Sequence, residues 1–285
     1  MTQFVVDRSP RGLVVASGPD ATSFLQSLLS QDLDPVADGE HVAALLLSPQ
    51  GKLDVALRAL RVGDEWWLDT DAEYGPRLIA SLTRFRIRVQ VELEDRTATT
   101  GMASLVGGDA APSRVHRLST RWGSEVGVDL LGPAAAVRAA VDALPAEIER
   151  WSPARFEAFR IEAGVPRLGV DVDEATIPQE AFLERDAVSF TKGCFVGQEL
   201  VCRIDTRGHV IRFLRGVRMQ GSQPPPPGAT VVVGGRDRGS LTSVAAVPGE
   251  DRVVGLAMVR REVEPPADAL VRWDSEERPA SLVAV

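Results

Sequence analysis

The chain has 285 residues and a formal net charge of −8, with apolar and charged fractions that are ordinary for a globular protein of two or three domains. The negative charge argues against a protein that coats nucleic acid, and no apolar run is long enough to span a membrane. Charged residues between Met1 and Leu13 argue against a signal peptide, and the only cysteines, Cys194 and Cys202, are too few for a disulfide framework, so we expect a cytoplasmic protein.

The N-terminal half predicts helices and strands that alternate along the chain. Helices are expected from apolar spacing and capping residues at 18–29, 74–84, 133–144 and 152–163. Strands are expected from alternating or short apolar runs at 41–47, 52–61, 66–69, 87–93 and 126–130. Near the fourth strand we interpret Arg84, Arg86 and Arg88 as alternate solvated positions. This order of elements predicts an α+β unit with an antiparallel sheet.

The C-terminal part predicts a small β-barrel. A polar segment at 167–187 is long for a connection, and such segments are often functional. Short strands separated by glycine, proline and acidic residues are expected at 230–233, 240–247, 253–259, 269–273 and 282–285. We place the boundary of the barrel near residues 206–211.

The stretch from Lys192 to Glu199, hereafter the octapeptide, contains the side chains that are best suited to catalysis or ligand binding. Its two glycines let the backbone approach a bulky ligand, and Gln198 begins a predicted helix whose N-terminus favours anions. The thiol of Cys194, close to the cation of Lys192, is predicted to lose its proton more easily than a free cysteine. Lys192 is one of only two lysines among many arginines, so we interpret it as a position that requires a compact ammonium.

Other functional interpretations of these residues are weaker. Cys202 lies eight residues after Cys194, and His209 lies seven residues after Cys202, but a structural zinc site needs a fourth ligand and none is evident, so metal binding is not favoured. Nothing in the sequence places a histidine beside Cys194 as a catalytic base. The arginines between 203 and 218 are more easily explained as solvated strand positions than as a basic patch.

The octapeptide resembles the K-G-C-[YF]-x-G-Q-E signature of the YgfZ proteins, folate-binding relatives of the glycine-cleavage T-protein that help to maintain iron–sulfur enzymes. Supporting resemblances lie at 18–25, 160–166, 178–181 and 239–243. The resemblance implies an α+β fold, a three-domain ring of T-protein type with antiparallel sheets and a C-terminal β-barrel. The implied domains are residues 1–40 plus 135–206, which carry the octapeptide, an inserted α+β domain at 41–134, and the barrel at 207–285.

The same resemblance implies a site for tetrahydrofolate or a one-carbon derivative of it. Glu180 would hold the pterin, and a carboxylate can accept two N–H donors from such a heterocycle. Cofactor-binding roles would also fall on Phe195, Gly197, Gln198, Glu199 and Asp71. Standing alone in a polar loop, Glu180 would be interpreted as a solvated acid.

One position departs from the aminomethyltransferases. Their catalytic aspartate lies five residues after the glycine of the first hairpin turn, and here that position is Ala56. Alanine can neither orient the folate amine nor stabilise charge. Asp54 lies on the same strand face, two residues away.

The sequence therefore leads to three hypotheses. The favoured one is a tetrahydrofolate-binding protein that supports assembly or repair of iron–sulfur enzymes, with Cys194 as the reactive thiol, Lys192 as its activator, and iron–sulfur enzymes or their assembly machinery as partners. The second is an aminomethyltransferase, against which Ala56 counts. The third is an accessory factor of tRNA modification that uses the arginines at 203–218, against which the net charge counts.

Overall fold

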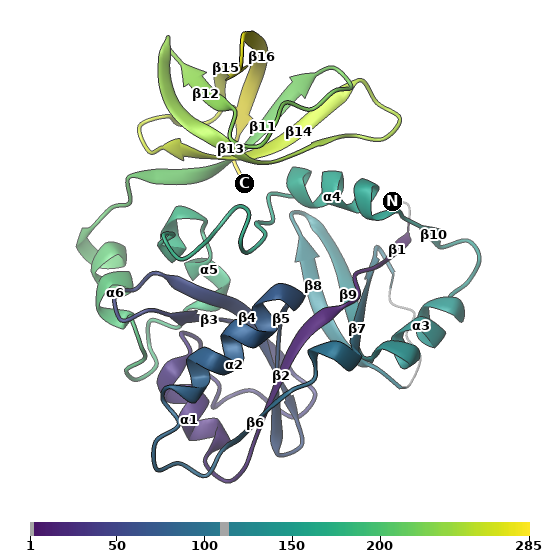
Figure 1. Ribbon diagram of the computed structural model, residues 1–285, viewed down its shortest axis with the longest axis vertical. Coiled ribbons are helices and arrows are strands. Elements are labelled where there is room, and N and C mark those ends of the chain that lie inside the picture. The colour runs from purple at the N-terminus through teal and green to yellow at the C-terminus, as the bar shows by residue number, and fades with distance from the viewer. Residues whose placement is uncertain (1–2, 109–113) are drawn as a thin grey trace. The chain divides into compact units, whose positions relative to one another are not determined.

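The computed structural model describes residues 3–108 and 114–285 (Figure 1). The chain forms two compact units. The first unit takes residues 1–120, 126–150 and 183–206, and the second unit takes residues 121–125, 151–182 and 207–285. The predicted α+β class, the antiparallel sheets and the C-terminal barrel are confirmed. The division into three domains stays a prediction.

The first unit contains two five-stranded sheets. One has the strand order β10-β1-β7-β9-β8, and the other has the order β3-β4-β5-β2-β6. The strands of the first sheet are β1 (Phe4–Asp7), β7 (Thr100–Val106), β8 (His116–Trp122), β9 (Glu125–Pro133) and β10 (Glu149–Arg150). Those of the second are β2 (Arg11–Ser17), β3 (His41–Leu47), β4 (Leu53–Val62), β5 (Glu65–Asp71) and β6 (Glu92–Asp95). Each sheet thus joins a strand from residues 1–40 to strands from residues 41–134.

The first unit also contains helices, one of which begins within the octapeptide. They are α1 (Ala21–Leu28), α2 (Gly75–Thr83), α3 (Ala134–Asp142), α5 (Glu184–Ala187) and α6 (Gln198–Arg207), with 3-10 turns η1 (Ala72–Tyr74) and η2 (Thr97–Thr99). Strand β4 shows why the hairpin forms: Leu53, Val55 and Leu57 are buried, while the residues between them are half-buried on the other face. The hairpin predicted over 41–61 is confirmed.

A buried ion network links the two sheets of the first unit. The Arg58 guanidinium on β4 donates to Asp69 on β5 at 2.5 Å and to Asp129 on β9 at 2.6 Å. Arg11 on β2 also pairs with Asp69, at 2.6 Å. Burial alone would raise the pKa of Asp69, but the two arginines outweigh it and hold that pKa below its usual value. Removing one partner from such a pair typically costs about 3–5 kcal/mol, so the network fixes how the sheets meet.

The strand predicted at 87–93 is wrong over residues 87–91. Strand β6 begins only at Glu92, and residues 84–90 form a loop in which Ile87 is 72% exposed. Arg88 has a φ of 58°, which a β-strand does not allow. The base of the loop is held instead by Gln90, whose backbone N–H donates to the Asp20 carboxylate at 2.7 Å. The alternation of apolar residues and arginines there reflects no buried face.

The second unit is a closed six-stranded barrel with one covering helix. The barrel order is β11-β14-β13-β12-β15-β16, and Figure 1 shows its strands in green to yellow. The strands are β11 (Arg212–Gln220), β12 (Thr230–Val233), β13 (Arg236–Ala246), β14 (Arg252–Arg260), β15 (Ala267–Trp273) and β16 (Glu276–Val283). Helix α4 (Pro153–Glu162) begins after Ser152, whose hydroxyl accepts from the Arg155 N–H at 3.3 Å, as the capping residues predicted. A 3-10 turn, η3 (Pro178–Glu180), follows in the long polar segment.

Arg160 locks α4 to the barrel within the second unit. Its buried guanidinium donates to Asp171 at 2.9 Å and to the Ser243 hydroxyl on β13 at 2.8 Å. The neighbouring Thr242 hydroxyl donates to Asp171 at 2.5 Å. Residues at 160–166 and 239–243, which the sequence singled out separately, therefore meet in one structural cluster.

Candidate functional site

The octapeptide forms a tight turn against the β3–β4 hairpin in the first unit. Gly197 has a φ of 80°, and a Cβ placed on it would lie 2.5 Å from the Ser48 carbonyl oxygen. Gly51, in the hairpin turn, has a φ of 69°, and its Cβ would lie 2.7 Å from the Cβ of Leu200. Only glycine fits at either position. Helix α6 then begins at Gln198, as predicted.

Lys192 ties the octapeptide to the end of α1. Its Nζ donates to the backbone carbonyl oxygens of Gln26 at 2.7 Å, Leu29 at 2.7 Å and Gln31 at 2.9 Å. Three donors that converge from one nitrogen match an ammonium and not the flat fork of arginine, which explains the rare lysine. The carbonyls at a helix C-terminus also carry partial negative charge.

The environment of Lys192 changes its proton affinity. Burial lowers the pKa of Lys192 to about 8, although Asp32 and Asp34 oppose the fall. The ammonium also lies 5.6 Å from the centroid of the buried Phe195 ring. Lys192 therefore has a structural role through its three carbonyl contacts, and its predicted action on the thiol of Cys194 stays a prediction.

The two thiols differ in accessibility. Cys194 is exposed in the turn before α6, whereas Cys202 lies on α6 and is half-buried. Gln198 is half-buried, and the exposed Glu199 forms an ion pair with Arg203 one helical turn later. The thiol of Cys194 is thus a nucleophile that solvent can reach.

Close to Ala56 on β4, the carboxylate of Asp54 is already engaged. Asp54 accepts from Arg77 Nε at 2.7 Å and from the Ser81 hydroxyl at 2.6 Å, so it fastens α2 to the sheet. Asp71 lies at the end of β5, where it forms an ion pair with Arg11. Its predicted contact with folate stays a prediction.

Glu180 lies in the second unit, at the end of η3, and its side chain is buried. The two carboxylate oxygens accept from Arg212 Nε at 3.0 Å and from Arg212 Nη2 at 3.1 Å, and the Ile177 N–H donates to Oε2 at 3.2 Å. Phe182, close by in sequence, stacks on Phe213 with ring centroids 5.3 Å apart and planes 2° from parallel.

Arg215 covers this aromatic pair, with its guanidinium carbon 4.9 Å from the Phe213 centroid. We call Glu180, Phe182, Arg212, Phe213 and Arg215 the Glu180 cluster. Phe182 has a φ of 59°, an uncommon conformation that proteins often keep at functional positions. The sequence indicated only Glu180, because neither the positive φ nor pairing across more than 30 positions leaves a local pattern.

Most arginines of the segment 203–218 have partners. Arg203 pairs with Glu199, Arg212 with Glu180, and Arg218 lies 3.8 Å from Glu162. Arg215 is buried against the phenylalanines. The side chain of Arg207 lies outside the described residues. The other four arginines of this segment are therefore paired or buried.

In the described part of the chain, no cluster of three or more His, Cys, Asp or Glu side chains is arranged to hold a metal ion. No helix within residues 3–108 and 114–285 has the length and apolar character needed to cross a membrane.

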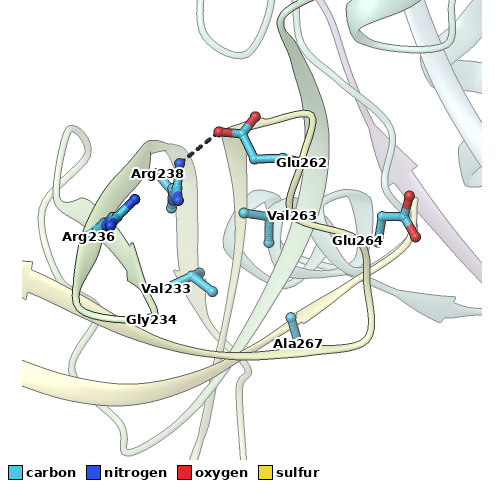
Figure 2. Close-up of a pocket in the computed structure, with 8 residues that line it drawn as sticks. All are labelled: Val233, Gly234, Arg236, Arg238, Glu262, Val263, Glu264 and Ala267. Carbon is cyan, nitrogen blue, oxygen red and sulfur yellow. Dashed lines mark hydrogen bonds and ion pairs between the residues drawn. The ribbon is translucent and has the colours of Figure 1, made fainter.

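A shallow pocket of about 430 Å³ lies on the barrel (Figure 2). It is lined by Val233, Gly234, Arg236, Arg238, Glu262, Val263, Glu264 and Ala267. Figure 2 shows Arg238 pointing to Glu262, with which it forms a 2.7 Å ion pair. None of the residues singled out from the sequence lines this pocket.

Comparisons with known proteins find relatives among the YgfZ proteins and the aminomethyltransferases. No model of a protein family matches the chain. The tRNA-modifying protein YgfZ of Escherichia coli O157:H7 is 28% identical over 285 residues, covering 92% of the chain and 87% of the relative. An aminomethyltransferase of Rubrobacter xylanophilus is 30% identical over 300 residues, covering 96% and 79%. The crystal structure of glycine cleavage system aminomethyltransferase T from Bartonella henselae superimposes with a TM-score of 0.82 at 20% identity, covering 100% of the chain and 86% of that structure.

Proposed function

The chain belongs to the family that unites the YgfZ proteins with the aminomethyltransferases, and from this premise we propose that it binds tetrahydrofolate or a one-carbon derivative and supports assembly or repair of iron–sulfur enzymes. The observation that carries the proposal is the octapeptide turn, in which Lys192 and Gly197 hold the exposed thiol of Cys194 in a fixed frame. The identity of the ligand as a folate and of the partners as iron–sulfur enzymes is proposed from the family resemblance.

Glu180 is the proposed pterin ligand. A carboxylate has about four acceptor positions, and Arg212 and the Ile177 N–H together use three of them. A heterocycle with two adjacent N–H donors can form both hydrogen bonds to Glu180 only when Arg212 gives up its hydrogen bond to one carboxylate oxygen. The proposal therefore includes a shift of Arg212 when folate binds, with the stacked phenylalanines next to Glu180 offering aromatic faces for the ring.

The YgfZ branch is favoured over aminomethyl transfer. Ala56 replaces the aspartate that the resemblance assigns to catalysis, and the nearby Asp54 is committed to Arg77 and Ser81. The aminomethyltransferases also normally lack the cysteine of the octapeptide. Within this proposal the chain keeps the folate site and has exchanged the catalytic carboxylate for a thiol.

A role beside tRNA modification is the second candidate. The Escherichia coli relative is named a tRNA-modifying protein, which is the observation that favours it. Support of iron–sulfur enzymes and a role beside tRNA modification are compatible if the enzymes that modify tRNA are iron–sulfur enzymes maintained by this chain. In that case the chain acts on the enzymes, and its effect on tRNA follows from them.

A complementation experiment tests the thiol step. Cys194→Ser and the matched Cys202→Ser variant are expressed in a strain that lacks the protein, and the activities of several iron–sulfur enzymes are measured. We expect Cys202→Ser to restore the activities and Cys194→Ser to fail, with both variants present at wild-type levels. Full rescue by Cys194→Ser would contradict the thiol role.

A further inference from the structure

The loop between α2 and β6 exposes basic and apolar side chains together. We call residues 84–89, with the sequence Arg-Phe-Arg-Ile-Arg-Val, the arginine loop. Arg84, Arg86 and Arg88 are all exposed. Phe85 is 39% exposed and Ile87 is 72% exposed, although both types of side chain are usually buried. In Figure 1 this loop joins the end of α2 to β6.

The arginine loop has a defined backbone. The N–H groups of Phe85, Arg86 and Ile87 donate to carbonyl oxygens two or three residues earlier, at 2.8 to 3.2 Å. At its far end, Gln90 and Asp20 are joined by a backbone hydrogen bond in addition to the Asp20 carboxylate contact. These contacts hold the backbone of the loop, and the side chains of residues 84–88 are exposed.

The charge of the arginine loop is not neutralised locally. Over residues 3–108 and 114–285, no carboxylate forms an ion pair with Arg84, Arg86 or Arg88. Arg86 donates to the Val91 carbonyl oxygen at 3.3 Å, which keeps its charge. On a chain with a net charge of −8, three such guanidinium groups mark a place for an anionic partner.

We propose that the arginine loop binds a single-stranded segment of RNA. The guanidinium groups contact phosphates, the Phe85 ring stacks on an unpaired base, and Ile87 packs against a neighbouring base face. Alternation of cations with exposed apolar groups suits a strand in which phosphates and unstacked bases also alternate.

An anionic membrane fits the loop less well. Stable membrane attachment by charge takes a cluster of about four to eight basic residues, usually next to an amphipathic helix or a lipid anchor. The arginine loop has three arginines, and it is a turn with only two apolar side chains at its exposed positions. A protein partner would need an acidic surface around an apolar pocket, and nothing in the structure indicates one.

The RNA site does not rest on the folate proposal. It uses none of the residues of the octapeptide or of the Glu180 cluster, so Glu180→Ala is expected to leave RNA affinity unchanged. Loss of folate binding and loss of RNA binding are therefore separable in one set of variants.

The test measures fluorescence anisotropy of a labelled RNA hairpin with an eight-nucleotide single-stranded loop, over a series of salt concentrations. The variant R84Q/R86Q/R88Q removes the three charges, and R236Q/R260Q/R261Q removes three exposed charges from the barrel as a matched control. We expect the first variant alone to reduce the slope of log K against log salt by about 2, because each phosphate that an arginine neutralises adds about 0.7 to that slope. Phe85→Ala is expected to weaken binding about 5- to 150-fold, and Phe85→Tyr to restore it.

Three outcomes would overturn the proposal. Wild-type protein that does not bind the hairpin rules the site out, as does a control triple variant that loses as much affinity as the loop variant. Binding to vesicles that contain anionic lipid, lost in the loop variant while RNA binding persists, would assign the loop to a membrane. Unchanged thermal unfolding midpoints of all variants show that the fold is intact.

Discussion

Replacing Lys192 by methionine removes the contacts that hold the octapeptide to α1. Three hydrogen bonds from a charged donor contribute about 1.5–3 kcal/mol each. Burial of the ammonium, which lowers the pKa of Lys192 to about 8, offsets part of this gain. The partial exposure of Lys192 weakens both terms, so we expect Lys192→Met to lower the free energy of unfolding by about 3 kcal/mol.

Urea unfolding followed by circular dichroism measures this change. The matched control is Lys52→Met, which replaces the chain's other lysine, an exposed residue of the β3–β4 turn, and is expected to stay within about 0.5 kcal/mol of wild type. Lys192→Arg is expected to fall between the two, since a planar fork reaches only part of the carbonyl set. A Lys192→Met variant as stable as Lys52→Met would refute the structural role of the ammonium.

Three further predictions concern the same region. In NMR spectra, the side-chain signal of Lys192, distinguished from that of Lys52 with the Lys52→Arg variant, should titrate near pH 8. Because this folded-state pKa lies below the unfolded value, the free energy of unfolding should rise between about pH 8 and pH 10.5. Gly197→Ala should lower the free energy of unfolding in urea by more than about 1 kcal/mol, because alanine would have to adopt a φ of 80° with its Cβ 2.5 Å from the Ser48 carbonyl oxygen. An unchanged free energy of unfolding would contradict the close turn. Mass spectrometry after brief treatment with a charged thiol reagent should find Cys194 modified before Cys202, and the reverse order would contradict their exposures.

Local patterns in the sequence predicted much of the fold. The hairpin at 41–61, the barrel strand at 230–233 and the helix that begins at Gln198 all follow from neighbouring residues, and the structure has each of them. Ser152 was recognised as a cap because capping involves residues only three positions apart.

The same local reasoning failed where distant residues decide the structure. The strand expected at 87–93 has the right period, yet only Glu92 and Leu93 belong to a sheet, and Ile87 stays in solvent. Strands β1 and β2 were missed because their pairing partners lie far along the chain.

The candidate site shows the same division. The octapeptide was visible as a cluster of chemically useful residues, and the rarity of lysine indicated a special position. The reason, three carbonyl oxygens more than 160 residues away from Lys192, exists only in the folded chain. The pairing of Arg212 with Glu180, across 32 residues, likewise leaves no trace in the sequence pattern.

The most direct test of the account is an anaerobic calorimetric titration with tetrahydrofolate. Wild type, Glu180→Ala and the control Glu262→Ala, which removes an ion-paired glutamate from the barrel pocket, are compared. With a folate site at Glu180, wild type and Glu262→Ala bind alike, and Glu180→Ala binds at least tenfold more weakly, a difference of about 1.4 kcal/mol. Equal affinity of all three proteins, or no binding by wild type, would contradict a folate site at Glu180.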